Sequence, residues 1–190
     1  MENRLQKRLA AIATSLEDSS VDLSPEIKLK VAELVLRLTD RSTSFGLFVI
    51  LGWKKKWQTY LDISDSHQDI FAKQKLNVMR LGQVEHKTYH DMAATLDFDG
   101  AILIDAAGNV VHSGVFIEGL RPRMVANRVN RGQFNDLSEQ FGFKSKVHAR
   151  HLSAISASYV FKGTTVFTVS EENDDVHIFE NGRIVHTLKS

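Results

Sequence analysis

Hydrophobic residues in the first 40 positions recur at helical spacing. Those of the first stripe are separated by four, three and four residues on an otherwise charged segment, and they are Leu5, Leu9, Ile12 and Leu16. Ser24-Pro25-Glu26 then offers a capping side chain, a proline suited to the first helical position and an acid for the first turn. The second stripe consists of Ile27, Val31, Leu34, Val35 and Leu38. The pattern predicts a helical hairpin over residues 1–42, whose apolar stripes must pack on the rest of the chain or on another subunit.

From Phe45 the pattern changes to that of an extended chain. The run from Gly46 to Gly52 is continuously apolar and bounded by glycine, which is typical of a strand covered on both faces. The three lysines between Trp53 and Trp57 predict an exposed turn. Residues 86–96 carry the stripe of a short helix.

The second half of the chain predicts several short strands and one long helix. Segments 101–104 and 110–116 form a hairpin around a turn that ends in Gly108-Asn109. A helix follows at about 149–160, and strands follow at 164–169, 176–180 and 183–188, the last two joined by Asn181-Gly182. Residues 119–149 are polar and irregular apart from a short helix at 135–141. We therefore predict an α/β domain, bordering on α+β, at residues 43–190, with a mixed, mainly antiparallel central sheet flanked by helices.

Composition mainly excludes classes of function. Lys plus Arg (24) nearly balance Asp plus Glu (23), so no field over the whole molecule attracts nucleic acid or an anionic membrane, and we expect neither as a partner. The chain has no cysteine, which excludes disulfides, thiolate metal ligands and a cysteine nucleophile. The N-terminus lacks the apolar core of a signal peptide and no apolar run is long enough to span a bilayer, so we expect a cytoplasmic protein.

Charged or very small residues stand at the edges of three apolar segments. Asp99-Gly100-Ala101 opens the first, Arg150-His151 opens the predicted long helix, and Ser170-Glu171-Glu172 closes a predicted strand. Carboxylates are ligands for hard divalent cations, whereas arginine and the free N–H groups at a helix start bind phosphate. The set indicates a site for a polyanionic ligand and its metal.

Each signature also has a purely structural interpretation. Asp99-Gly100 is a common turn dipeptide, and the acids after Ser170 could be a charged strand end that continues into the turn at 173–175. Gly114, inside the strand that follows the first signature, could mark the close approach of a ligand or of another backbone segment, or equally a β-bulge.

Read with their flanks, DGAILIDAAGNVVHSGVFI, ARHLSAISASY and TTVFTVSEENDDVHIFENGRI, the signatures resemble the diadenylate cyclase (DisA-N, or DAC) family from about Phe45 to Ile184. The resemblance implies a DAC-type fold and a nucleotidyltransferase that condenses two ATP molecules into the second messenger cyclic di-AMP, with release of pyrophosphate. It also implies a homodimer or larger homo-oligomer in which two domains meet face to face.

The resemblance assigns roles to residues of this chain. Asp99, Arg150 and His151 are expected to be catalytic, and Asp99 and Glu171 are expected to bind Mg²⁺ or Mn²⁺. The residues expected to bind ATP are Gly100, Ala101, Gly114, Val115, Phe116, Arg150, His151 and Ser170.

Two positions depart from the family pattern. Leu152 stands where the signature has a second arginine, and Ala149 stands where a hydroxyl residue usually precedes the first. The missing cation keeps a second hypothesis open, in which the chain is a DAC-like sensor that binds ATP or a cyclic dinucleotide. A third is an assembly protein whose helices drive oligomerisation. If residue 152 faces the phosphates, Leu152→Arg is expected to tighten ATP binding.

Overall fold

The computed structural model describes residues 2–40, 45–62, 69, 71, 75–80 and 100–189. Helices α1 (Glu2–Glu17) and α2 (Pro25–Thr39) form the predicted hairpin. Pro25 occupies the start of α2 as expected, but the side chain of Ser24 makes no capping hydrogen bond. The apolar stripes of both helices are buried, and they include Leu5, Ile12, Leu16, Val31, Leu34 and Leu38.

The described strands form one mixed sheet in the order β2-β5-β4-β1-β6-β7-β8, with β3 paired to β5 beside this path. Among these strands only the β1–β4 pair is parallel, and the other pairs are antiparallel. The predicted mixed, mainly antiparallel sheet is therefore confirmed. The strands are β1 (Leu47–Leu51), β2 (Leu61–Asp62), β3 (Leu76–Asn77), β4 (Ala101–Ile104), β5 (Asn109–Ile117), β6 (Thr165–Val169), β7 (Val176–Glu180) and β8 (Arg183–Leu188).

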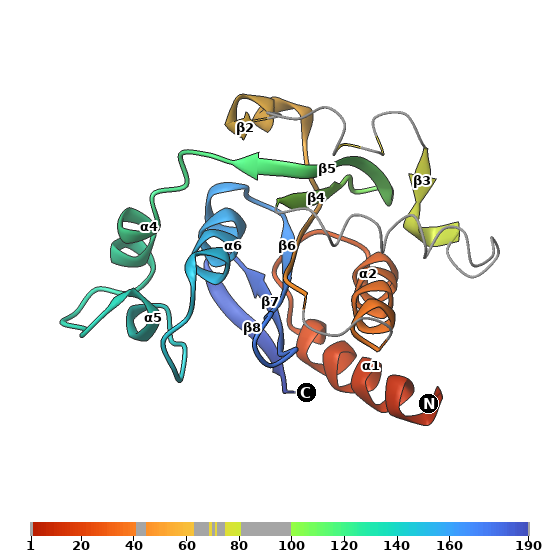
Figure 1. Ribbon diagram of the computed structural model, residues 1–190, viewed down its shortest axis with the longest axis horizontal. Helices are drawn as coiled ribbons and strands as arrows, with labels where there is room; N and C mark the ends of the chain where they lie inside the picture. The colour runs from red at the N-terminus through yellow and green to blue at the C-terminus, as the bar shows by residue number, and fades with distance from the viewer. Residues whose placement is uncertain are drawn as a thin grey trace.

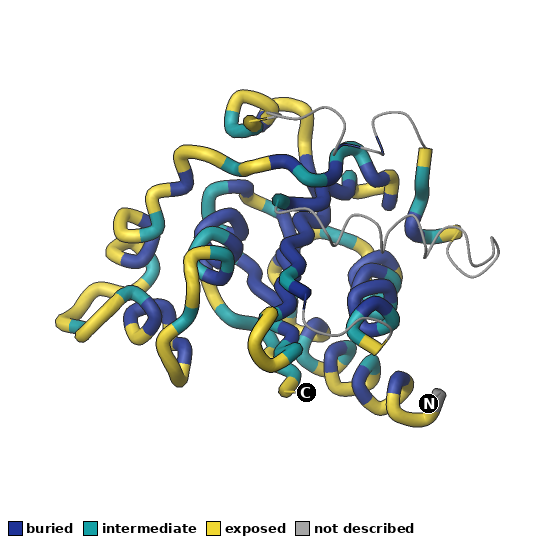
Figure 2. The backbone as a smooth tube through the Cα atoms, in the orientation of Figure 1, coloured by how far each residue is buried: buried dark blue, intermediate teal, exposed yellow. Residues whose placement is uncertain are grey.

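Helices cover both faces of the sheet, and β6 passes between α2 and α6 (Ala149–Val160) in Figure 1. Successive residues of a strand point to opposite faces. Leu47, Val49 and Leu51 of β1 accordingly join a hydrophobic core with the hairpin, whereas Phe48 and Ile50 join a second core with α6. The buried residues follow the central strands and the inner faces of the helices (Figure 2). Burial on both faces explains the uninterrupted apolar run of β1.

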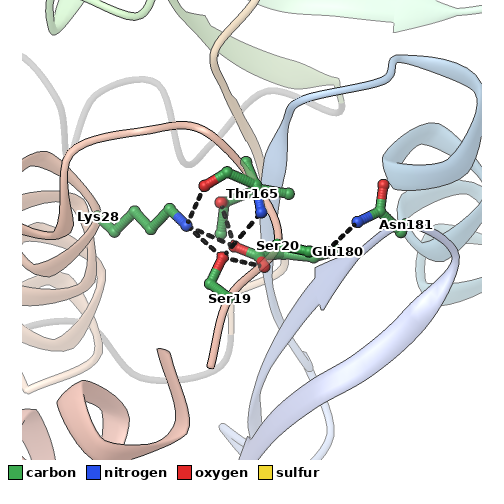
Figure 3. A network of polar contacts seen from close by, with 7 residues as sticks. Ser19, Ser20, Lys28, Thr165, Glu180 and Asn181 are labelled. Carbon is green, nitrogen blue, oxygen red and sulfur yellow. Dashed lines mark hydrogen bonds and ion pairs between the residues drawn. The ribbon is translucent and has the colours of Figure 1, made fainter. Parts of the chain in front are cut away.

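A buried ion pair fastens the helical hairpin to the sheet (Figure 3). Lys28 Nζ of α2 lies 3.1 Å from Glu180 Oε1 at the end of β7, and the two side chains are 2% and 4% exposed. Ser19 Oγ donates a hydrogen bond to Glu180 Oε2, and Thr165 donates one to Oε1. The hairpin and one face of the sheet share a hydrophobic core. The boundary between a helical hairpin at residues 1–42 and a domain at residues 43–190 therefore stays a prediction from the sequence. Residues 41–44 lie outside the described part.

Two sequence-based expectations need correction. Trp53 and Trp57 do not lie in an exposed turn, because both rings are buried against Phe161 beside the short 3₁₀ helix η1 (Lys55–Tyr60), and only the lysines face solvent. The segment 119–149 is also more regular than expected. It contains α4 (Pro122–Val129), which was not predicted, and α5 (Leu137–Gln140), which was.

A second 3₁₀ helix, η3 (Val78–Arg80), follows β3. The helix predicted at 86–96 lies outside the described residues. Among the helices that are described, none combines the length and the apolarity needed to cross a membrane.

Candidate functional site

Strand register brings the first and the third signature to one end of the sheet. Val49 of β1 is opposite Ile102 of β4, and Leu47 is opposite Val169 of β6. Gly100 and Ala101 precede Ile102, while Ser170 and Glu171 follow Val169. The start of β4, the start of β1 and the end of β6 are therefore neighbours. Asp99 itself lies outside the described residues.

Gly100 and Gly114 allow two backbones to approach each other closely at this end. Both have positive φ, +139° and +64°. A Cβ on Gly100 would come within 2.6 Å of the carbonyl carbon of Gly114 and 2.8 Å of the Val115 nitrogen. The β4–β5 register shifts between Ala101 and Leu103, so Gly114 lies in a β-bulge. The bulge interpretation of Gly114 is thus correct, and it places the glycine beside the first signature.

Arg150 lies over Gly46, the residue before β1. A Cβ at position 46 would overlap the Arg150 guanidinium, so this glycine provides the space that the arginine occupies. Arg150 Nη1 is 3.4 Å from Glu171 Oε2, and the Arg150 side chain is 24% exposed against 59% for Glu171. The first turn of α6, the positive end of the helix dipole, is at the same place. A cation, a carboxylate and a helix N-terminus therefore converge on one half-open surface.

Ser170-Glu171-Glu172 begins a turn rather than extending β6. Ser170 N donates to the Asp175 carbonyl and Asp174 N donates to the Ser170 carbonyl, which closes the turn. Both acids therefore reach the start of α6: Glu171 contacts Arg150, and Glu172 Oε1 lies 2.7 Å from His148 Nε2. Because β6 ends at Val169, the pleat of the strand does not direct the two carboxylates to opposite faces of the sheet.

His151 faces a different space from Arg150, since consecutive helix residues are rotated by about 100°. Its side chain is buried between α6 and β7, edge-on to the rings of Phe143 and His177. Burial, the largest cause, together with the neighbouring His177, Arg150 and His148 lowers the pKa of His151 to about 4, although Asp175 acts in the opposite direction. At neutral pH His151 is thus an uncharged imidazole. The structure does not bring it together with Arg150 as one cationic pair.

The remaining residues expected to bind ATP have unequal access to a ligand. The side chains of Ala101 and Val115 are opposite each other and buried in the core beneath α6. Phe116, the next residue of β5, is 44% exposed. Of this trio only the Phe116 ring offers an apolar surface, and the other two positions could contribute their backbones.

Leu152 does not point at the surface of Arg150 and Glu171. It lines a shallow apolar groove with Met124 of α4, Leu137 of α5 and Ser153, and it packs against the core. Residue 152 therefore does not face the surface where phosphates are expected, which was the condition for Leu152→Arg to tighten ATP binding.

The described residues fit a hard divalent cation only in part. Glu171 offers an exposed carboxylate, the oxygen ligand that Mg²⁺ and Mn²⁺ prefer. Within the described residues no cluster of three His, Asp or Glu side chains could hold a metal. A complete site would need Asp99 or ligand phosphates.

Two residues of this region were missed from the sequence. Gly46 had a weak signal, a glycine directly before a buried strand. His177 had none, because a histidine inside an apolar strand is ordinary, and only its contact with His151 sets it apart.

No family model matches the chain, and no curated protein matches it in sequence. Among solved structures, one described as a hypothetical membrane spanning protein from Bacillus cereus is 14% identical, with a TM-score of 0.50, over 87% of this chain and 64% of that one. A double mutant of DacA from Staphylococcus aureus is 15% identical, with a TM-score of 0.47, over 87% of each chain. This chain spans less than two thirds of the Bacillus cereus chain. The mixed sheet with flanking helices is a fold that this chain shares with the Bacillus cereus protein.

Proposed function

We propose that this chain is a diadenylate cyclase, which condenses two ATP molecules into cyclic di-AMP. The observation that carries the proposal is the convergence of Arg150, Glu171 and the α6 N-terminus beside the Gly100–Gly114 contact. A triphosphate needs fixed positive charge and N–H donors, and a half-exposed carboxylate beside them suits the accompanying cation. The three signatures that meet here are those whose sequences resemble the family.

The proposed reaction joins two nucleotides across a two-fold axis. Each 3′-oxygen attacks the α-phosphorus of the other ATP, the bond to the β-phosphate breaks, and pyrophosphate leaves from both. Asp99 takes up the hydroxyl proton, and Arg150 stabilises the charge that develops on the phosphoryl oxygens. A divalent cation held by Asp99 and Glu171 would neutralise phosphate charge. The exposed Phe116 ring provides an apolar surface for adenine.

One chain is not enough for this reaction, because each domain holds only one of the two nucleotides. A face-to-face homodimer presents the same surface twice and brings each 3′-oxygen to the partner nucleotide. Much of the rate acceleration comes from positioning the two nucleotides, and only the dimer positions both. The turnover rate per chain should therefore depend on protein concentration around the dimer dissociation constant.

Incubation of the purified chain with ATP and Mg²⁺, Mn²⁺ or Co²⁺, followed by chromatography of the nucleotides, tests the proposal. We expect cyclic di-AMP from the parent and from Glu26→Gln, an exposed acid at the start of α2 in the helical hairpin. Asp99→Asn and Glu171→Gln should lose product while unfolding at the parental temperature. Product from Asp99→Asn at the parental rate would remove Asp99 from the mechanism.

A binding module is the second candidate, and the position of Leu152 favours it. With Leu152 in the α4 groove, Arg150 is the single cation of its signature that reaches the proposed site. A protein that binds ATP in calorimetry but forms no cyclic di-AMP with any of the three metals would be a sensor rather than a cyclase.

A further inference from the structure

The shallow apolar groove that contains Leu152 lies where α4, α5 and the first turns of α6 meet. These helices pack together on the side of α6 that faces away from the helical hairpin (Figure 1). The groove has a volume of about 420 Å³, and its lining consists of residues 121–124, Leu137 of α5, and Ala149, Leu152 and Ser153 of α6. We call it the Met124 groove. None of the residues expected to bind ATP or a metal lines it.

The groove presents a continuous apolar surface to solvent. Met124 is 46% exposed, and among the described residues Phe116 is the other large hydrophobic side chain with such exposure. Met124 does not stand alone, because Pro122, Leu137 and Leu152 beside it are also partly exposed. A contiguous apolar surface with a charged rim is typical of a protein interaction site. The flexible thioether side chain of methionine adapts readily to the shape of a partner.

The segment that forms the rim of the groove is strongly basic. Residues 119–135 contain four arginines and no aspartate or glutamate, in a chain whose net charge is only +1. Much of this segment is exposed (Figure 2), including Arg121, Arg123, Arg128 and Arg131. Within the described part of the chain, no carboxylate forms an ion pair with any of the four. The local field therefore favours an anionic partner.

Arg121 has a backbone conformation that its residue type disfavours. It precedes α4 with φ +47° and ψ 68°, in the left-handed region, and its side chain makes no capping hydrogen bond. Glycine or asparagine would suit this backbone better. The guanidinium lies instead beside the apolar groove, where Nη1 donates to Met124 Sδ at 3.9 Å. A strained residue whose side chain serves neither the helix nor an ion pair among the described residues indicates a role in binding.

We propose that the Met124 groove binds a peptide segment of a protein partner in which a large apolar side chain is flanked by carboxylates. The apolar side chain packs on Met124 and Leu152, and the carboxylates pair with Arg121 and Arg123. Methionine and arginine are the residue types enriched at protein interfaces. A nucleic acid suits the groove less well, because its lining has no aromatic ring on which a base could stack. The proposal uses no residue of the proposed ATP site, so it stands whether or not the chain is a cyclase.

Selection of random short peptides displayed on phage, with the full chain as bait, tests the groove. We expect the enriched peptides to combine Leu, Met or Phe with neighbouring Asp or Glu residues. Fluorescence anisotropy then measures the affinity of the most enriched peptide, and the same peptide with Asn and Gln in place of its acids is expected to bind at least tenfold more weakly. An absence of enrichment, or enrichment of peptides without acids, overturns the proposal.

Variants of the chain place the bound peptide. Met124→Gln keeps the size of an exposed side chain and should weaken binding about tenfold. Arg121→Gln combined with Arg123→Gln should weaken it by a similar factor. Arg128→Gln combined with Arg131→Gln removes the same charge outside the lining, and it should change the affinity less than about twofold. Equal losses in the two double variants would show unspecific attraction and contradict the proposal.

Stability measurements separate binding from a structural role of Arg121. Arg121→Gly suits the left-handed backbone, so it should weaken peptide binding without lowering the temperature of thermal unfolding. Unchanged binding together with a lower unfolding temperature would contradict the role assigned to this arginine.

Two other occupants of the groove would give different results. An oligomer that dissociates in Met124→Gln, measured by light scattering, would show that the groove joins copies of this chain. A labelled single-stranded RNA that depends on Arg121 and Arg123 but not on Met124 would identify a nucleic-acid site. Either result overturns the proposal. Cyclic di-AMP formation by Met124→Gln should equal that of the parent, so a failure of the proposed reaction and a failure of the groove are distinguishable.

Discussion

Gly46 has no side chain, and this absence makes room for the side chain of Arg150. The guanidinium of Arg150 fills the space above Gly46 and from there reaches Glu171. A residue without a side chain thus decides where the Arg150 guanidinium of the proposed site lies. His151, one residue further along α6, is buried against β7 instead and is uncharged at neutral pH.

Gly46→Ala should displace Arg150 without unfolding the protein, because a guanidinium at the end of a flexible side chain can move aside. Loss of a charge-assisted contact to phosphate is worth about 1.5–3 kcal/mol, so ATP affinity should fall at least tenfold. Calorimetry measures the affinity. In the Arg150→Ala background the same substitution should have no further effect on ATP binding. Additive losses would show that Gly46 acts independently of Arg150.

The buried histidines predict a fall in stability on acidification. Burial lowers the pKa of His151 to about 4, and it also lowers the pKa of His177 and of His186. Below an ordinary histidine pKa of about 6.5 the unfolded chain binds protons that the folded chain rejects. The free energy of unfolding should therefore decrease as pH falls from 6.5 towards 4.

Denaturant titrations across this pH range measure the effect. His151→Phe keeps an aromatic ring but cannot titrate, so its free energy of unfolding should depend less steeply on pH. His148→Gln changes an exposed histidine and serves as the control. An equal slope in the parent and in His151→Phe would contradict the assignment.

At the scale of elements, α6 directs its first residues to three different places. Arg150 faces the ends of β1 and β6, His151 faces β7, and Leu152 faces the groove against α4. Helical rotation alone separates them. Arg150, His151 and Leu152 therefore do not form one phosphate-binding cluster in this chain. Helix α4, which the sequence pattern did not predict, provides the packing partner of Leu152.

Leu152→Arg should accordingly leave ATP affinity unchanged, in contrast to the expectation from the sequence. The new cation would lie in an apolar groove that Arg121 and Arg123 already border. We expect it to destabilise the fold by about 1 kcal/mol, whereas Leu152→Met should be nearly neutral. Calorimetry with ATP and thermal unfolding measure the two effects. Tighter ATP binding would show that position 152 reaches the phosphates after all.

For the molecule as a whole, the helical hairpin is a layer of the fold. It covers one face of the sheet, and the Lys28–Glu180 pair fixes it to the end of the sheet away from the proposed site, where β6 begins and β7 ends (Figure 3). The buried carboxylate also accepts hydrogen bonds from Ser19 and Thr165. These bonds satisfy charges that would otherwise be isolated in the core.

Lys28→Met should destabilise the protein by about 3–5 kcal/mol, since it leaves the Glu180 carboxylate buried without its counter-ion. Adding Glu180→Gln removes that charge, so the double variant should be more stable than Lys28→Met alone. Denaturant unfolding measures both. Lys30→Ala, which breaks a half-exposed pair with Glu33 on the same helix, is the control and should change stability by less than about 1 kcal/mol. A double variant less stable than the single would argue against a dominant charge effect.

The sequence alone determined those elements that have a strong local periodicity or a clear turn signal. The stripes of α1 and α2, the apolar run of β1 and the Asn181-Gly182 turn each correspond to an observed element. Trp53 and Trp57 were misread because lysines between them suggested solvent, whereas packing on Phe161 buries both rings. The order of the three signatures also indicated that they belong to one site.

Only the tertiary structure decided which side chains of the signatures meet. Register places Gly46, Ser170 and the start of β4 side by side, and no local pattern encodes pairings between residues so far apart. Helical rotation and the unpredicted α4 then separated Arg150 from His151 and Leu152. The contact of His151 with His177 depends on α6 packing across β7, which brings together residues 26 positions apart. Periodicity reports which face of an element is buried, but only packing determines what that face touches.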